Sequence, residues 1–237
     1  NDPDLNLLGQ CSNEELQLLI SILTTDPRDG DTRWTESLTG TPEFRLLAPD
    51  HRRYWQLIAA ELQRYGANTL ASLVRLGQGV TYREILVDVC DKLDVNYNQK
   101  STTETIELAL LMKVLEKSLD QMSPEELAAF SHNMHLDLTN PTPQLILIAV
   151  QAAIRTSSLA ALELATMLSA SVITSLGGIA TWGTVVVASR ALSVLAGPLA
   201  IALSSAWMIS DITGPAYRVT IPACIIVSWL RQQHLSR

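Results

Sequence analysis

The sequence predicts an all-α protein: a multi-helix bundle with an acidic N-terminal head and a glycine-broken apolar helical hairpin near the C-terminus. Apolar residues recur at helical spacing through the head, and no segment alternates apolar and polar residues as a half-buried strand does. Four Ser/Thr-x-x-Glu patterns mark helix starts. Leu164–Ser189 is a run of 26 residues without a charge, interrupted by two adjacent glycines. We expect Leu159–Thr213, which contains this run, to be the stretch that organises the rest.

Charge divides the 237-residue chain into two predicted regions. Residues 1–144 carry 12 basic and 22 acidic side chains, whereas residues 145–237 carry 5 and 2, which gives the net charge of −7. The change coincides with Asn-Pro-Thr-Pro at 140–143, and helices tend to end before a proline. We therefore expect an acidic helical head over 1–140 and an apolar helical region over 144–237. The negative head repels nucleic acid, which is excluded as its partner.

Cysteine usage and the first residues indicate the compartment. Cys11, Cys90 and Cys224 are odd in number and far apart, which is typical of buried free thiols in a reducing compartment. The sequence begins Asn1-Asp2-Pro3 with no basic-then-apolar leader, so we expect no export signal.

Helix starts in the head are expected in chain order. Asp2 precedes Pro3 and caps a short helix that Gly9 closes. Asp50 is expected to cap a helix over Arg52–Tyr65, which Gly66 ends, and a further short helix is expected over Asn68–Leu76. Capping boxes open the other helices, at Ser12–Glu15, Thr81–Glu84, Ser101–Glu104 and Ser123–Glu126.

The apolar region is predicted to begin with a helix over Leu145–Ser157 and to continue as a hairpin over 159–196. With the turn at Gly177-Gly178, each arm has 18 residues and spans about 27 Å, close to the bilayer hydrocarbon thickness of about 30 Å. A third arm, 199–213, follows Gly197-Pro198 and suits a buried or re-entrant helix.

Two charges interrupt the hairpin at similar distances from its turn, so Glu163 and Arg190 are predicted to lie at one end and to pair. Small residues recur every four positions, as in close membrane helix pairs, but such rows also line helix crossings in soluble cores. Periodicity does not separate bilayer insertion from a permanently buried hairpin. The candidate residues of this segment are Glu163, Gly177, Gly178, Trp182, Gly183, Arg190, Gly197 and Pro198.

A second candidate site is a polar cluster around His51, Arg52 and Arg53, together with Glu61 of the same predicted helix. Its position at a predicted helix N-terminus favours an anionic partner, either a ligand or an acidic side chain of the head. An internal ion-pair network is the default interpretation. The full set of candidates is His51, Arg52, Arg53, Trp55, Glu61, Tyr82, Arg83, Tyr217 and Arg218.

Catalytic chemistry has little support in the sequence. No Ser-His-Asp, Cys-His or nucleophile-elbow pattern is present. We therefore predict no catalytic residue, no metal site, no cofactor and no enzymatic activity. An enzyme would need a pocket lined by His51–Arg53 and Arg83 with perturbed titration.

Four segments carry a resemblance to a known family. Residues 51–63 (HRRYWQLIAAELQ) closely resemble a segment of the YaaW-like family of uncharacterised bacterial proteins. Residues 82–89 (YREILVDV), 216–223 (AYRVTIPA) and 4–12 look like further family segments, in the same order. This family is grouped with the ubiquinol–cytochrome c chaperones, which implies a helical assembly factor beside a membrane. The resemblance implies no catalytic residues.

Two hypotheses for function follow. The first is a non-enzymatic, membrane-associated protein of the bacterial cytoplasm, at the cytoplasmic face of the inner membrane or inserted in it. Its hairpin packs on the head or enters lipid, in a mode similar to helical pore-forming toxins. The second is a soluble interaction or assembly factor whose hairpin forms the core or contacts a partner's apolar helix. The partner is accordingly a bilayer or an apolar helix, with a homo-oligomer left open.

Overall fold

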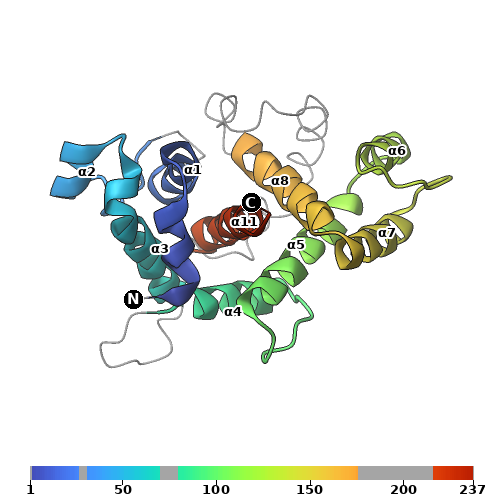
Figure 1. The fold of residues 1–237 in the computed structure, drawn as a ribbon, viewed down its shortest axis with the longest axis horizontal. Helices are drawn as coiled ribbons and strands as arrows, with labels where there is room; N and C mark the ends of the chain where they lie inside the picture. The colour runs from blue at the N-terminus through green and yellow to red at the C-terminus, as the bar shows by residue number, and fades with distance from the viewer. Residues whose placement is uncertain (1, 27–30, 70–79, 176–215, 237) are drawn as a thin grey trace.

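The computed structural model describes residues 2–26, 31–69, 80–175 and 216–236, and these fold into helices (Figure 1). Strand pairing within these ranges is limited to one isolated bridge between Thr25 and Thr32. The predicted all-α class is confirmed. The elements in chain order are η1 Pro3–Gln10, α1 Asn13–Thr24, α2 Pro42–Leu47, η2 His51–Tyr54, α3 Trp55–Thr69, α4 Tyr82–Lys92, α5 Thr103–Leu119, α6 Pro124–Asn133, α7 Pro143–Thr156, α8 Ser158–Ser175 and α11 Tyr217–Leu235.

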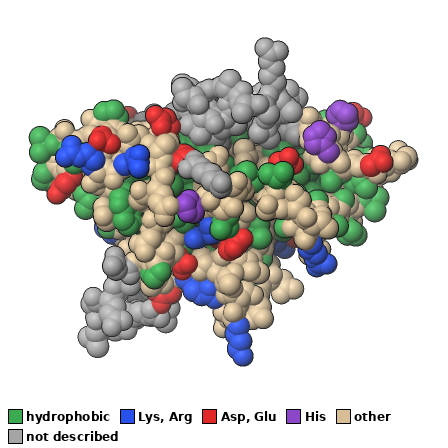
Figure 2. All heavy atoms as spheres, in the orientation of Figure 1, with side chains coloured by type: hydrophobic (Ala, Val, Ile, Leu, Met, Phe, Trp, Pro, Cys, Tyr) green, Lys and Arg blue, Asp and Glu red, His purple; other side chains and the backbone are tan. Residues whose placement is uncertain are grey.

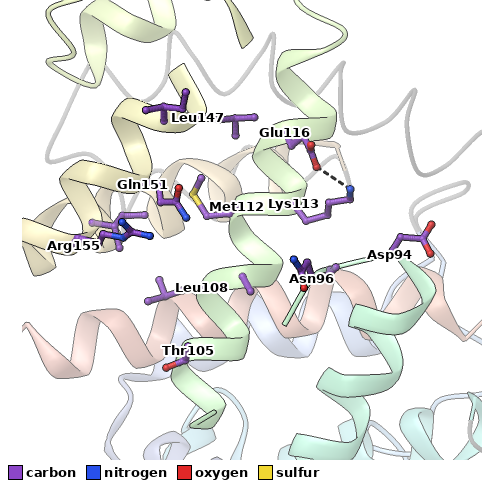
Figure 3. Close-up of a pocket in the computed structure, with 14 residues that line it drawn as sticks. Asp94, Asn96, Thr105, Leu108, Met112, Lys113, Glu116, Leu147, Gln151 and Arg155 are labelled. Carbon is purple, nitrogen blue, oxygen red and sulfur yellow. Dashed lines mark ion pairs between the residues drawn. The ribbon is translucent and has the colours of Figure 1, made fainter. Parts of the chain in front are cut away.

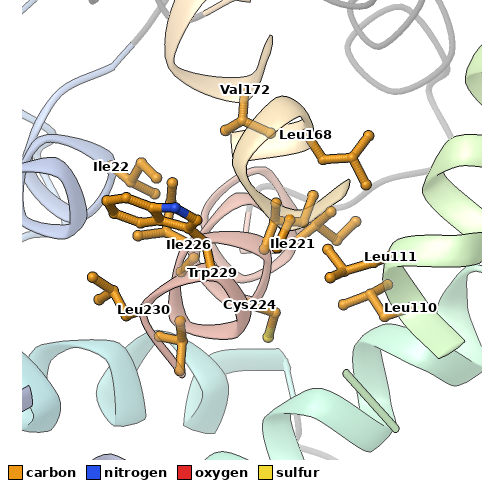
Figure 4. Packing of buried hydrophobic residues seen from close by; sticks show 14 of the residues in the cluster. Ile22, Leu110, Leu111, Leu168, Val172, Ile221, Cys224, Ile226, Trp229 and Leu230 are labelled. Atoms are coloured by element: carbon orange, nitrogen blue, oxygen red, sulfur yellow. The ribbon is translucent and has the colours of Figure 1, made fainter. Parts of the chain in front are cut away.

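The described helices are arranged around α11, which lies in the middle of the fold (Figure 1). It packs against α8 most extensively and also against α1, α3, α4, α5 and η1. Trp229 is 1 % exposed, and Figure 4 shows it with Ile226 beside Ile22 of α1. On another side, Ile221 faces Leu168 of α8 and the leucines of α5 (Figure 4). A helix from the C-terminal end of the chain thus supplies the centre of the hydrophobic core.

This arrangement differs from the expectation that Leu159–Thr213 organises the molecule. The first predicted arm is present as α8, a continuous helix over Ser158–Ser175. It lies beside α11 rather than at the centre of the described helices (Figure 1). The rest of the predicted hairpin and the third arm fall in 176–215, outside the described residues.

Capping chemistry is confirmed at most of the predicted starts. In the Ser12 box, the Glu15 amide donates to Ser12 Oγ at 3.2 Å, and the Ser12 amide donates to Glu15 Oε2 at 2.7 Å. The same reciprocal pair of bonds opens α4 at Thr81 and α6 at Ser123. At Asp2 the side chain accepts from the Asp4 amide, and Pro3 begins η1.

Five predicted helix boundaries are wrong. Gly9 lies inside η1, which ends at Gln10. Gly66 lies inside α3, which continues to Thr69, so the predicted start at Asn68 is wrong as well. A Cβ on Gly66 would lie 2.3 Å from Ile85 Cγ1, so the glycine allows α3 and α4 to approach closely. The cap of α5 is Thr102, one residue after the predicted Ser101.

Asp50 does not cap a helix with its side chain, which is the fifth correction. The chain instead enters α3 through the 3-10 turn η2, and Asp50 Oδ1 accepts from Asn13 Nδ2 at 3.3 Å. Pro222 lies within α11. Proline removes one backbone hydrogen bond there, and the burial of the helix on all sides offsets that cost.

Candidate interaction surface

His51, the centre of the predicted polar cluster, is buried and fully hydrogen-bonded inside the protein. Its Nε2 lies 2.7 Å from Gln17 Oε1 and its Nδ1 contacts the Tyr54 hydroxyl. Burial lowers the pKa of His51 below its ordinary value, against the attraction of Asp50 and Glu14, which raises it. The imidazole is therefore neutral at pH 7 and fixes η2 to α1, with no ring nitrogen left for a substrate.

The neighbours of His51 do not form a charged cluster with it. Arg52 and Arg53 are exposed, and the Arg52 amide donates to Asn13 Oδ1 at 3.0 Å. Trp55 is half-buried and covers Gly9, where an added Cβ would lie 3.0 Å from the indole ring. These residues tie η2 to the preceding helices and leave two solvated guanidinium groups.

Glu61 belongs to a different contact from the one predicted. It is 3 % exposed, forms an ion pair with Arg64, and accepts from the Ser37 amide at 2.9 Å and the Ser37 hydroxyl at 2.7 Å. Burial raises the pKa of Glu61, but the hydrogen bonds from Arg64 and Ser37 lower it by more. The pKa of Glu61 is therefore below its usual value. The carboxylate fastens the chain around Ser37 to α3 and does not pair with Arg52 or Arg53.

Tyr82 leads to a buried network that the sequence did not reveal. Its hydroxyl donates to Glu107 Oε1 at 2.8 Å, and Arg231 Nε donates to Glu107 Oε2 at 2.7 Å. Arg231 also donates to the Asp4 carbonyl at 2.8 Å. Glu107 is fully buried, and burial raises its pKa to about 7, against the attraction of Arg231. This network joins α4, α5, α11 and η1.

The sequence feature that could have pointed to this network is a charged residue within an apolar helical pattern. Glu107 adjoins Ile106 on the face of α5 that carries Leu110 and Val114, and Arg231 ends an apolar run in α11. A charge at such a position is rarely buried without a partner. Since 124 residues separate the two, the sequence shows that each needs a partner without showing which one.

Arg83 also has an internal role. It donates to Thr103 Oγ1 at 3.2 Å and to the carbonyls of Ser101 at 2.7 Å and Gln99 at 2.8 Å. The guanidinium therefore holds the loop before α5 against α4. These hydrogen bonds do not join Arg83 to His51.

Tyr217 and Arg218 begin α11 on another side of the molecule. The Lys92 ammonium lies 5.3 Å from the centre of the Tyr217 ring. Burial, together with the neighbouring Asp88 carboxylate, raises the pKa of Tyr217 to about 12. Arg218 Nε is buried with no hydrogen-bond partner among the described residues. The residues of the predicted cluster thus lie in five separate structural contacts.

Of the residues proposed for the hairpin, only Glu163 is described, and its side chain is exposed on α8. Solvent exposure removes the cost of an unpaired charge at that position. Gly177, Gly178, Trp182, Gly183, Arg190, Gly197 and Pro198 lie outside the described residues, so the predicted pairing of Glu163 with Arg190 stays a prediction.

The strongest feature of the described surface is the outer face of α7. The sequence-predicted helix over Leu145–Ser157 is present as Pro143–Thr156, and only Ile146 and Val150 of its 14 residues are buried. Leu145 is 44 % exposed and Ile148 is 64 % exposed; Leu159, at the start of α8, is 62 % exposed. Figure 2 shows hydrophobic side chains on the surface where α7 lies. We call these three side chains the α7–α8 apolar surface.

A groove lies beside this surface, between α5 and α7. It has a volume of about 580 Å³, and its walls are mainly apolar. Figure 3 shows Met112 of α5 facing Gln151 of α7 across it, with Arg155 at one side and the Lys113–Glu116 ion pair at another. This groove forms without the residues of the predicted polar cluster.

One helix in the described part of the chain, α8, is long and apolar enough by length and composition to cross a membrane. Of its 18 residues, 56 % are buried within the protein. Leu164 and Leu168 are fully buried, and Ser169 Oγ donates to the Ile225 carbonyl of α11 at 3.4 Å. In this structure α8 is therefore a core helix with one exposed end.

Comparison with known proteins finds relatives along nearly the whole chain. A UPF0174 protein of Helicobacter pylori strain J99 is 40 % identical over 233 residues, which cover 97 % of this chain and 91 % of the relative. A second UPF0174 protein of that strain is 35 % identical and covers 84 % of this chain and 97 % of the relative. The UPF0174 protein YaaW of Escherichia coli K12 is 31 % identical over 235 residues, covering 98 % and 94 %.

A shorter match concerns the N-terminus. A family model described as a domain of unknown function (DUF3944) matches residues 1–34, which contain η1 and α1. No solved structure matches the chain.

Proposed function

The chain belongs to the UPF0174 family, which includes YaaW, and from this premise we propose that it is a non-enzymatic helical protein that associates with a membrane through the α7–α8 apolar surface. The supporting observation is the exposure of Leu145, Ile148 and Leu159 on two consecutive helices, α7 and α8. Transferring such a side chain from water to an apolar environment contributes about 1.5–3 kcal/mol. Because Leu145, Ile148 and Leu159 are 44 %, 64 % and 62 % exposed, each would contribute part of that amount on entering lipid.

The length of α7 decides how it would meet the bilayer. Its 14 residues span about 21 Å, less than the hydrocarbon thickness of about 30 Å. Its inner face, with Ile146 and Val150, packs in the protein core. The helix therefore suits a position in the plane of the interface, with its outer side chains in the acyl region.

Insertion of the predicted hairpin, including a pore-forming mode, is the further-reaching form of this proposal. It would require α8 to leave α11, which would expose buried side chains of α11 such as Ile221 and Ile225 to water. That cost favours peripheral association as the resting state. Insertion would need a trigger strong enough to offset it.

The alternative is a soluble interaction or assembly factor, and the burial of more than half of α8 favours it specifically. In that case the α7–α8 apolar surface contacts an apolar helix of a partner protein. Both forms place the protein in the bacterial cytoplasm, which agrees with three buried free cysteines. They differ in whether lipid alone is sufficient for binding.

Vesicle flotation separates them. The wild-type chain is expected to float with phosphatidylcholine vesicles, and the double variant Leu145→Asp, Leu159→Asp is expected to remain at the bottom of the gradient. Leu46→Asp is the matched control, because Leu46 is 81 % exposed on α2, away from α7. Absence of flotation by the wild type, together with recovery in the cytosol after fractionation of native cells, would refute membrane association.

A further inference from the structure

The groove between α5 and α7 has the composition of a binding site for a single apolar chain. Its walls come from three elements. Apolar lining residues are Leu108, Ala109 and Met112 of α5, Leu147, Ile148 and Ile154 of α7, and Val95 of the segment after α4. A mainly apolar wall with a few placed polar groups is typical of small-molecule sites, and the volume of about 580 Å³ lies within their usual range.

The charged residues around the groove differ between its two ends. Lys113 is neutralised by Glu116 at 2.8 Å. Arg155 has no hydrogen bond or ion pair among the described residues, and Gln151 stands one helical turn before it on the same face. The acidic residue Asp94 lines the groove as well and lies on the far side of α5 from Arg155 (Figure 3). An anionic group is therefore favoured near Arg155 and disfavoured near Asp94.

We propose that this groove binds a single-chain amphiphile with an anionic head, such as a medium-chain carboxylate. The head group is held by the Arg155 guanidinium and the Gln151 amide, and the acyl chain lies along Met112, Leu108 and Leu147. Arginine presents a fork of N–H donors that matches a carboxylate with two parallel hydrogen bonds.

The dimensions agree with such a ligand. The lining residues of α5 run from Thr105 to Glu116, a rise of about 16 Å. That length accommodates most of a medium-length acyl chain in an extended conformation. The groove adjoins the proposed membrane contact and shares Ile148 with it, whereas Leu145 and Leu159, the two residues changed in the flotation variant, do not line the groove. A free amphiphile could occupy it whether or not the protein touches a bilayer.

Isothermal titration of the full chain with dodecanoate tests this directly, without vesicles and below the concentration at which the probe forms micelles. Saturable binding is expected for the wild type. Dodecyltrimethylammonium, which has the same chain and a cationic head, is expected to bind at least about tenfold more weakly. Arg155→Gln is expected to weaken dodecanoate binding by about tenfold, and since Arg155 is exposed the variant should fold normally.

Two further variants complete the test. Ala109→Phe fills the groove from a partly exposed wall position and is expected to weaken both probes. Arg52→Gln removes an exposed guanidinium of η2 and is expected to change neither. Absence of saturable dodecanoate binding would overturn the proposal. Equal affinity of Arg155→Gln and wild type, or of the two probes, would overturn the assignment of the head group, whatever the outcome of vesicle flotation.

Discussion

Helices α7 and α11 both contain many apolar residues, yet α7 lies at the surface and α11 in the core. In α11 nearly every residue from Val219 to Leu230 is buried, because six elements surround it. In α7 two of the 14 residues are buried, and leucine and isoleucine side chains face outward. Apolar composition therefore identifies helices that avoid water without saying what covers them. An apolar helix whose outer face is exposed to solvent is the one that indicates a binding surface.

The largest expected difference between the two helices is in stability. Trp229→Ala in α11 removes a large side chain that is 1 % exposed, and the resulting cavity is expected to lower the free energy of unfolding by about 3–5 kcal/mol. Urea unfolding followed by circular dichroism measures this. A loss below about 1 kcal/mol would show that α11 is not the centre of the core.

The next effect concerns pH and the contact of α11 with Glu107. The folded-state pKa of Glu107 is about 7, above its ordinary value of 4.5, so the folded protein binds this proton more tightly than the unfolded chain. The contribution of Glu107 to the free energy of unfolding is fully present below about pH 4.5 and is lost as the pH rises towards 7. The expected loss is on the order of 3 kcal/mol.

Urea unfolding at several pH values between 4.5 and 7 measures that slope. Glu107→Gln keeps the shape of the side chain and removes the titration, so its stability is expected to vary less over this interval. Arg231→Met leaves the carboxyl buried without its ion-pair partner and should steepen the dependence. Identical slopes for wild type and Glu107→Gln would exclude Glu107 as the titrating group.

A smaller effect is expected where α3 and α4 approach each other. Alanine is the better helix former, yet Gly66→Ala would place a Cβ 2.3 Å from Ile85 Cγ1 in a fully buried position. We expect a net loss of about 1 kcal/mol. Ile85→Ala removes the obstructing atoms, so in a thermal or urea double-mutant cycle Gly66→Ala should become stabilising in that background. Additive effects would mean that the close approach is unimportant.

The smallest effect on stability is expected on α7. Leu145→Asp with Leu159→Asp changes exposed positions, so the free energy of unfolding is expected to stay within about 0.5 kcal/mol of wild type. Binding to vesicles should nevertheless be lost. Chemical unfolding and flotation on the same samples check both statements, and a large loss of stability would mean that these side chains belong to the core.

These contrasts also show what the sequence could reveal. Caps at Ser12, Thr81 and Ser123 were predictable because the bonds that define them lie within four residues. Gly66 was mistaken for a helix end because its reason is a contact with Ile85 on another helix. Short sequence patterns predict hydrogen bonds between residues that are close in the chain. They do not predict contacts between helices, because the two partners are far apart in the sequence.

The candidate sites followed the same rule. His51, Glu61 and Arg83 were predicted to belong to one polar cluster, but in the structure each contacts a different set of internal partners. The Glu107–Arg231 pair was missed because its members are distant in sequence. The α7 helix was predicted, yet its exposed face depends on which helices pack beside it, which the apolar pattern does not specify.

Native-state hydrogen exchange of the full chain, with and without phosphatidylcholine vesicles, tests the distinction between α7 and α11 most directly. Amides of buried core helices exchange slowly, and those of a partly covered surface helix exchange faster. Vesicles are expected to slow exchange in α7 and at the start of α8 while leaving α11 unchanged. Unchanged exchange in α7, or loss of protection in α11 on adding vesicles, would contradict the account.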